Sequence, residues 1–318
     1  MINIRYHIVS LTAVFLSLAI GVAMGTGFLN KATVSQLKKQ IAGAEKGITQ
    51  ANEDRDTAQA EVDRFEESDA ALLATSASLV GGKLSRIPVL VIANENIDED
   101  SLEQLQSVLG AADADVRGTL TVTDRLRLDA GDDPDLADIV GTTSTSRPVV
   151  QSALTTAFAD ALVQAAARSI DSTALAPALI QQLIDGNYLS FQEPASGLDA
   201  TTVLAGGGYR YVFASGPDPR VPDAEFLLPV LSNLAAKGPT PVVAVSAAVG
   251  ADADSTRTTW VGAIRDNTDL RDEVSTVDDL ERFTGLLAAV LALDDLGAEV
   301  RGHYGIGTGR QSELPLPS

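Results

Sequence analysis

The chain has 318 residues and no cysteine, and its 23 Lys and Arg stand against 43 Asp and Glu, a formal net charge of −20. Because phosphate neutralisation needs clustered cations, this balance argues against a nucleic-acid-binding protein. The lack of cysteine excludes disulfides, thiolate zinc sites and a cysteine nucleophile. The two histidines, His7 and His303, leave little for a Ser-His-Asp set or a multi-histidine metal site.

The first expected element is an apolar helix of 22 uncharged residues, Ile8–Leu29, bounded by Arg5 and Lys31. As a helix it extends about 33 Å, enough to cross a hydrocarbon core. A cleaved signal peptide is the alternative, since Ala23–Gly25 is a passable cleavage site after an apolar run. We favour an uncleaved single-pass anchor because the apolar run is longer than a signal peptide usually needs.

The charges that flank this helix bear on its orientation. Lys31, Lys38 and Lys39 follow it, whereas Arg5 precedes it, and this count alone favours a cytoplasmic carboxyl side. A long domain translocates largely regardless of flanking charge, and an acidic, cysteine-free body is compatible with export. We therefore expect an extracytoplasmic body and a protein of the cytoplasmic membrane.

Two patterns in the first 72 residues predict a homodimer. Three small residues spaced by four, which include a GxxxG pair, allow two membrane helices to approach closely: Ser17, Gly21 and Gly25. Five heptads then favour a parallel two-stranded coiled coil of about 58 Å, although three successive Ala at the d positions make it thin. The predicted interface comprises Val34, Leu37, Ile41, Ile48, Arg55, Val62, Phe65 and Leu72, with the charged Arg55 at an a position. The alternative is a single amphipathic helix folded back on its own domain.

Beyond Gly81–Gly82 the pattern changes to alternating strands and helices, which predicts an α/β, Rossmann-like domain with a mainly parallel sheet. The expected strands are Pro88–Ala93, Val116–Val122, Tyr209–Ala214, Pro241–Ser246 and Glu273–Val277. The expected helices are Asp98–Leu109, Val149–Ile170, Ala174–Ile184, Asp223–Lys237, Ser255–Asn267 and Asp278–Leu296.

These elements give four parts: a stub and anchor (1–30), a coiled coil (31–80), an α/β head domain (81–296) and an irregular C-terminal tail (297–318). Asp129–Asp135 and Gly141–Arg147 are expected as loops.

The order of parts resembles the actinobacterial MctB/SteB family, often described as copper transporters. Four segments carry the resemblance: INIRYHIVSLTAVFLSLAIGVAMGTGF at the start, VLVIANENID, STVDDLERFTGLLAAVLAL and GHYGIGTG near the end. The resemblance covers most of the chain and implies one of two roles. One is a mycobacterial envelope protein linked to copper efflux. The other is a membrane-anchored dimer that pairs with a cytosolic partner, SteA, and acts on cell-wall hydrolysis during cell separation.

The residues available for copper are few. Copper(I) prefers thiolate or thioether ligands and copper(II) prefers imidazole, yet both methionines, Met1 and Met24, lie in the N-terminal segment. Asp252 and Asp254 suit hard cations instead. His303 is the weak candidate metal ligand, and a histidine hydrogen-bonded in a docked tail is its simpler interpretation. We expect no required cofactor.

No common enzyme motif is present: GxSxG, GxxxxGK[ST], HExxH and a GxGxxG between strand and helix are all missing. The carboxylate pairs Asp132–Asp133, Asp278–Asp279 and Asp294–Asp295 have a simpler explanation in the high acidic content, and Asp278–Asp279 fits a helix N-terminus. We expect no catalytic residue. The few ligands for copper favour one of the two roles that the resemblance implies: a membrane-anchored scaffold in cell-wall remodelling, with envelope proteins and a SteA-like protein as partners. The alternative that the resemblance implies is a copper transport or efflux component.

Overall fold

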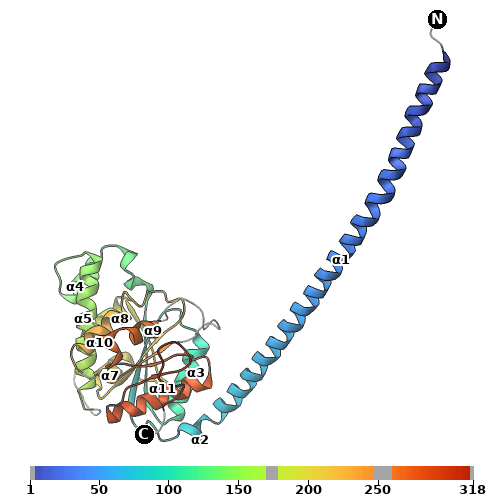
Figure 1. The fold of residues 1–318 in the computed structure, drawn as a ribbon. Helices are drawn as coiled ribbons and strands as arrows, with labels where there is room; N and C mark the ends of the chain where they lie inside the picture. Colours follow the sequence, from blue (N-terminus) through green and yellow to red (C-terminus); the bar gives the residue numbers. More distant parts are fainter. Residues whose placement is uncertain (1–3, 170–177, 239, 247–259, 316–318) are drawn as a thin grey trace. The chain divides into compact units, whose positions relative to one another are not determined.

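The structure is a computed structural model that describes residues 4–169, 178–238, 240–246 and 260–315, and of residues 26–32 it describes the backbone alone. The chain divides into two units, Met1–Ser68 and Asp69–Ser318. Figure 1 shows a long helix in the first unit and the sheet with its covering helices in the second. The finer boundaries expected at residues 30, 80 and 296 stay predictions.

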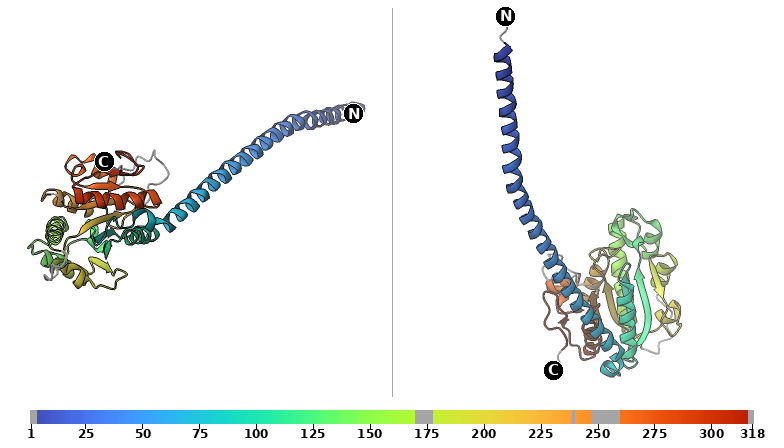
Figure 2. Two further views of the ribbon diagram at one scale, coloured as in Figure 1. Left: turned by 90° about the horizontal axis from the view of Figure 1, so that it is seen from below. Right: turned by 90° about the vertical axis from the view of Figure 1, so that its right-hand side faces the viewer.

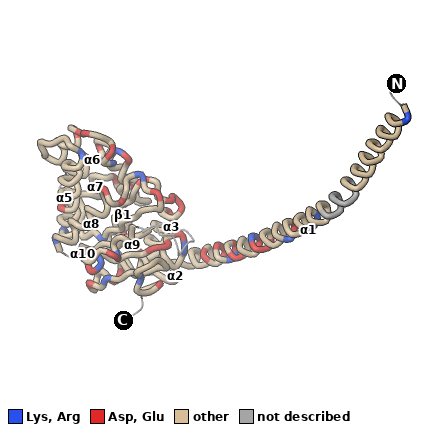
Figure 3. Tube along the Cα trace, turned by 45° about the horizontal axis from the view of Figure 1, so that its top comes forward, with Lys and Arg blue, Asp and Glu red and all other residues tan. Residues whose placement is uncertain are grey.

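Helix α1 (Ile4–Ala74) runs unbroken through the apolar segment and the heptads, as the sequence predicts. Its later part carries both charge signs, whereas Figure 3 shows an uncharged stretch after the basic residue near its start. Side-chain hydrogen bonds one turn apart, such as Gln50 Nε2 to Asp54 Oδ1 at 2.9 Å, support the exposed helix. Ile4–Gly25, with a mean hydropathy of 2.2, is long and apolar enough to cross a membrane. A signal sequence meets the same criteria, so that alternative stays open.

The helix ends before the glycine pair expected to break it. A short helix, α2 (Ser76–Val80), follows after Thr75, and Gly81 and Gly82 then turn the chain toward the first strand. Gly82 has a φ of +81°, a region that favours glycine. Its N–H donates to Asp113 Oδ2 at 2.9 Å, which ties the turn to the head domain.

The second unit is built on a seven-stranded sheet in the order β3-β2-β1-β4-β5-β6-β7. All neighbouring pairs are parallel except β2 and β3, which are antiparallel. The mainly parallel α/β fold is therefore confirmed. The strands are β1 (Pro88–Asn94), β2 (Asp115–Val122), β3 (Leu189–Gln192), β4 (Arg210–Ser215), β5 (Val242–Ser246), β6 (Ser275–Val277) and β7 (His303–Tyr304).

Helices cover both faces of this sheet (Figure 2). Alternate residues of β1 and β4 point to opposite faces, so Leu90 and Phe213 join one hydrophobic core while Val91 and Ala214 join the other. The helices are α3 (Glu99–Ala111), α4 (Pro134–Val140), α5 (Arg147–Ala166), α6 (Ala178–Asp185), α7 (Ala200–Ala205), α8 (Leu227–Ala235), α9 (Trp260–Asp266), α10 (Thr268–Arg271) and α11 (Phe283–Asp295).

Several expected boundaries shift. Pro134 begins α4 with Asp133 as its N-cap, so the expected loop at 129–135 is shorter. Helix α11 begins at Phe283, not at Asp278, so the assignment of Asp278–Asp279 to a helix N-terminus is wrong. Part of the expected helix Ser255–Asn267 lies outside the described residues. The tail begins within a short 3-10 helix, Leu296–Ala298, and is otherwise irregular except for β7, which extends the sheet.

Candidate functional site

The predicted dimer interface lies along α1. Its apolar a and d side chains are exposed in the single chain, with Ile41 53% and Ile48 62% exposed. Each interface residue lies within one uninterrupted helix, so the spacing by three and four becomes a continuous apolar stripe. We call these residues, Val34, Leu37, Ile41, Ile48, Arg55, Val62, Phe65 and Leu72, the seam. The exposed seam can therefore bury its apolar surface against a second helix.

The small-residue stripe in the apolar segment has room for a close neighbour. Apart from the adjoining residues and the backbone of its own helix, a Cβ added at Gly21 or Gly25 would meet nothing within 4 Å. The Ser17 hydroxyl donates to the carbonyl of Val14 at 2.9 Å, so its hydrogen bond is made within the helix. The stripe thus presents backbone and small side chains outward, the geometry that close helix pairs in membranes use.

His303 lies in β7 and is 4% exposed. Its Nδ1 is 2.9 Å from Thr276 Oγ1, and that hydroxyl accepts from Arg265 Nε at 2.8 Å. The Thr276 hydrogen is therefore free to donate to Nδ1, which makes the neutral imidazole the natural form. Burial, followed by the nearby Arg265 charge, lowers the pKa of His303. His303 is thus a hydrogen-bonded residue of the docked tail.

The structure describes few other residues that suit copper. His7 is exposed near the start of α1, and Met24 lies 68% exposed in its apolar segment. Asp252 and Asp254 lie outside the described residues. Within the described ranges no group of three or more His, Cys, Asp or Glu side chains is arranged to hold a metal ion.

Asp278 is the centre of the contact that docks the tail. Its Oδ2 lies 2.6 Å from Arg265 Nη1, and the two side chains are 1% and 2% exposed. The carboxylate also accepts from the N–H groups of Ile306 and Gly307, at 2.6 Å and 3.0 Å. Arg265 Nη2 donates to the carbonyl of Tyr304 at 2.7 Å. We call this set of contacts the tail clasp, and it explains why GHYGIGTG is rich in glycine at this position.

Asp279 differs from its neighbour Asp278. It is 4% exposed and has a φ of +68°, an uncommon conformation for a residue with a side chain. Burial raises its pKa to about 7, while Arg282, 4.0 Å away, opposes the shift. Arg282 also lies 3.7 Å from Asp69 in the last turns of α1. Asp279 and Asp69 thus share one cation within the second unit.

A second carboxylate, this one partly buried, lies at the topological switch point, where the chain leaves β1 in one direction and β4 in the other. Open α/β sheets bind ligands at such points. Asp223 Oδ1 accepts from Ser215 Oγ at 2.7 Å and from Asn94 Nδ2 at 3.1 Å. Asn94 also bonds the backbone of Val221, so the loop after β4 closes over the switch point. Burial raises the pKa of Asp223 to about 6.

The remaining carboxylate pairs are structural. Asp133 caps α4 by accepting from the Leu136 N–H at 2.9 Å, and it accepts from Tyr188 OH at 2.8 Å and Arg147 Nη2 at 3.1 Å. Asp294 pairs with Lys83 at 3.6 Å in a half-exposed contact. The sequence interpretation missed Asn94, Ser215 and Asp223. The signal was available, because Asn94 and Ser215 are polar residues that end continuous apolar strands.

Comparison with known proteins shows which family this chain resembles over its whole length. A model of the family described as "Copper transport outer membrane protein, MctB" matches residues 1–315. The "Copper transporter MctB" of Mycobacterium tuberculosis (strain ATCC 25618 / H37Rv) is 26% identical over 330 residues, covering 98% of each chain. The protein of the same name from Mycobacterium leprae (strain TN) is 25% identical over 332 residues, again covering 98% of each. The likeness therefore spans the long helix and the sheet alike.

Proposed function

The chain belongs to the MctB family, and from this premise we propose that it is a membrane-anchored envelope protein that acts as a dimeric scaffold for other proteins. The exposed seam on α1 carries the proposal. Apolar side chains repeated in heptads along one helix gain by packing against a second helix of the same pattern. A chain anchored by its first helix meets a second copy side by side, which favours a parallel pair.

The head domain supports a scaffold in a different way. The switch point, where an α/β fold usually binds its ligand, is occupied by the protein's own Asn94, Ser215 and Asp223. The tail clasp likewise uses Arg265 and Asp278 on the chain itself. These polar clusters satisfy each other, which suits a rigid body that presents its surface to partners.

Orientation follows from the same proposal. With the head domain outside the cytoplasmic membrane, the short segment Met1–His7 remains in the cytosol. That segment is then the contact for a cytosolic partner, and the head domain is the contact for envelope proteins that remodel the cell wall. A reporter fused to each end of the chain tests this arrangement directly.

Copper transport is the second candidate, favoured by the description of the family and by the names of the mycobacterial relatives. In this chain the thioether ligands are limited to two methionines near the amino terminus, and the imidazole ligands to two histidines. Copper handling would then depend on His303 or on assembly with other proteins. His303→Ala is the matched variant for this candidate.

One experiment separates the two functions. Cells that lack the protein are complemented with the parent chain, with the seam variant Ile41→Asp/Ile48→Asp, or with His303→Ala, and cell separation and copper tolerance are both scored. The scaffold predicts that the seam variant fails to restore separation while His303→Ala restores it. Copper transport predicts instead that deletion lowers copper tolerance and that His303→Ala fails to restore it. Normal separation in the deletion strain contradicts the scaffold proposal.

A further inference from the structure

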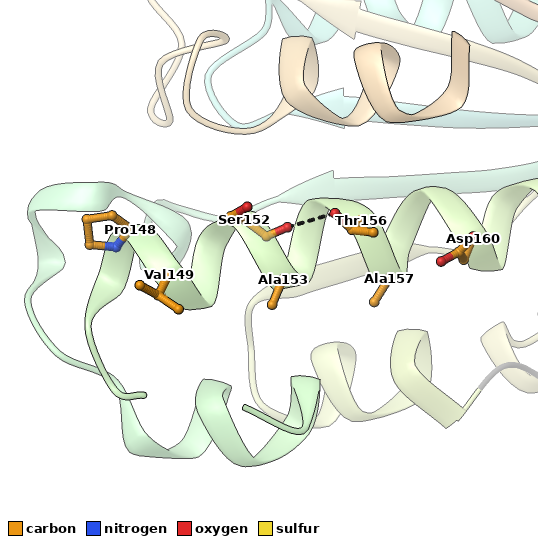
Figure 4. A pocket seen from close by; sticks show the side chains of 7 residues that line it. All are labelled: Pro148, Val149, Ser152, Ala153, Thr156, Ala157 and Asp160. Atoms are coloured by element: carbon orange, nitrogen blue, oxygen red, sulfur yellow. Dashed lines mark hydrogen bonds between the residues drawn. The ribbon is translucent and has the colours of Figure 1, made fainter. Parts of the chain in front are cut away.

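Exposed large apolar side chains are few in the part of the second unit that the structure describes. They are Leu72, Leu79, Val149, Val300 and Ile306. Val149 borders a groove on α5, where the next residues on the same side of the helix are Ala153 and Ala157 (Figure 4). A single large apolar side chain beside small ones is ordinary protein surface. Leu72 and Leu79 differ, because they are seven residues apart, which is the spacing of the seam.

Burial marks the side of this helical segment that packs on the head domain. Ser76 and Val80 on α2 are 7% and 0% exposed, and Leu73 packs against the core that contains Val80. One turn before Leu73, Asp69 forms an ion pair of 3.7 Å with an arginine of the head domain. These four residues are spaced by four, three and four, which is one side of a continuous helix. The helical phase is therefore kept through the break between α1 and α2.

Two exposed flanks border this buried stripe, and they differ in composition. At 3.6 residues per turn, Ala70 and Ala77 lie about 70–90° around the helix from the stripe on one side. Leu72 and Leu79 lie at a similar angle on the other side. All four side chains are exposed, Leu72 by 37% and Leu79 by 50%. The flank that carries the two leucines is therefore the side with apolar surface left to bury.

The heptad register identifies what covers the leucine flank. Counting by sevens from Phe65 gives Leu72 and Leu79, so both leucines are at d positions. In a parallel two-stranded coiled coil, d residues line the contact with the partner helix. The next a positions, Asp69 and Ser76, face the chain's own head domain instead. Beyond Phe65 two copies of this chain can therefore meet through their d positions.

The size of the leucine flank also favours a second copy over a different protein. Specific interfaces between separate proteins bury about 1,200–2,000 Å² in total, far more than two leucines offer. As the continuation of a seam, the same two leucines only add to a contact that the preceding heptads have already formed. A two-fold axis along the helices then places each leucine next to its equivalent.

We propose that the dimer interface extends past the end of α1 onto α2, with Leu72 and Leu79 of one copy packed against the same residues of a second copy. This inference rests on the proposed dimeric scaffold and adds a joint between the two head domains. A coiled coil that ended at Phe65 would leave each head domain free to turn independently. A contact at Leu79 holds the two head domains in one mutual orientation, which suits a scaffold for other proteins.

Single cysteines test this contact, because the chain has none of its own. An introduced thiol in the purified full chain can then form a disulfide only with the same position of a second copy, and a disulfide requires two Cα atoms about 4.4–6.8 Å apart. Leu72→Cys and Leu79→Cys are treated with diamide in detergent micelles. Ala70→Cys and Ala77→Cys, exposed on the other flank, are the matched controls. We expect the linked dimer to form about tenfold faster at the two leucine positions than at the two alanine positions.

Ile41→Cys, within the seam, distinguishes failure of this inference from failure of the scaffold. If Ile41→Cys links while Leu79→Cys links no faster than Ala77→Cys, the interface ends before the head domain. The inference is then wrong and the dimeric scaffold stands. If neither Ile41→Cys nor Leu79→Cys links faster than Ala77→Cys, the chain forms no such dimer, and the scaffold proposal is wrong together with the inference.

Discussion

Asp223 connects three segments at the carboxyl edge of the sheet through one carboxylate. Ser215 at the end of β4 and Asn94 at the end of β1 both donate to its Oδ1. Asp278 and Asp133 each form an ion pair with an arginine, whereas burial is the largest influence on the pKa of Asp223. Burial without a cation favours the protonated acid, which is why its pKa rises to about 6.

This shift makes the stability of the head domain depend on pH. In the unfolded chain Asp223 loses its proton near its ordinary pKa of 3.8, whereas in the folded head it does so near 6. Between these values the folded state binds more protons, so this residue makes stability fall as pH rises from about 4 to 6 and then level off. Asp223→Asn keeps an oxygen acceptor and cannot ionise. We expect the free energy of unfolding of the variant to exceed that of the parent by on the order of 1 to 3 kcal/mol at pH 7.

Urea unfolding of both proteins between pH 4 and pH 8 measures this difference. The gap in unfolding free energy between variant and parent should grow from pH 4 to pH 6 and stay constant above. Asp218 is an exposed carboxylate in the same loop. The unfolding free energy of Asp218→Asn should therefore follow that of the parent at a constant difference over the whole pH range. Curves for Asp223→Asn that also run parallel to the parent would show that Asp223 ionises normally.

Individual residues are the level at which the sequence was least informative. Which strand neighbours which, and where a loop returns, decide that Asn94 and Asp223 meet across 129 positions. No local pattern records that meeting. The same holds for Arg265 and Asp278, which join the strand edge to the tail. His303 was predictable in kind, since a glycine-rich tail that docks must bury its polar groups with partners.

At the scale of elements, the tail clasp gives the glycines of residues 305–309 a specific role. Gly305 has a φ of +112°, and a Cβ there would overlap the Asp278 carboxylate. Gly238 is its matched control, because its φ of +111° is nearly the same while a Cβ there would meet nothing within 4 Å. Gly305→Ala should therefore lower the free energy of unfolding by about 2–4 kcal/mol, because backbone strain and overlap act together. Gly238→Ala should cost the strain alone, roughly 1 kcal/mol.

The urea midpoint gives these costs, and trypsin cleavage after Arg310 reports on the tail itself. Release of the segment from Gln311 onward should be faster in Gly305→Ala than in the parent and unchanged in Gly238→Ala. Equal destabilisation in both variants would mean that the backbone conformation, and not the contact with Asp278, is what requires glycine.

The seam on α1 yields a prediction at the same scale. Ile41→Asp together with Ile48→Asp places like charges on facing a positions, which should abolish dimerisation. Ala42→Asp with Thr49→Asp adds the same charges one position along the same helix, outside the seam, and should leave the dimer intact. Sedimentation of chains that begin at Lys31 distinguishes the two. If the parent chain sediments as a monomer at tens of micromolar, the seam is not a dimer interface.

Elements with a strong period were predicted well, and short elements were not. The helix with five heptads and the apolar strands β1, β2, β4 and β5 lie within a few residues of their expected places. Strand β3 has four residues and β7 has two, too few for any periodicity to be visible. Both depend on pairing with a strand already in the sheet, which is a tertiary effect. Helix α11 begins later than expected because Asp278 is held in the tail clasp and Asp279 has a φ of +68°, which is not helical.

At the scale of the whole molecule, the predicted anchor and the seam belong to one helix but demand different geometries. Crossings built on GxxxG are right-handed, whereas heptad seams are left-handed. Counting heptads back from Val34 leaves Gly21 and Gly25 outside the a and d positions. A dimer that uses both stripes must therefore change its crossing between the membrane and the coiled coil.

If the dimer is continuous through the membrane, the small-residue stripe of Ser17, Gly21 and Gly25 should matter for function even when the seam is intact. Gly21→Ile with Gly25→Ile adds bulk where this chain leaves open space, so a single helix tolerates it while a close pair cannot form. We expect lower crosslinking of the membrane helices and impaired cell separation at normal protein level. Ala19→Ile with Ala23→Ile adds bulk on the opposite side of the helix and should behave as the parent does. The idea of one continuous dimer is wrong if deletion of the protein impairs separation while Gly21→Ile with Gly25→Ile shows normal crosslinking and restores separation.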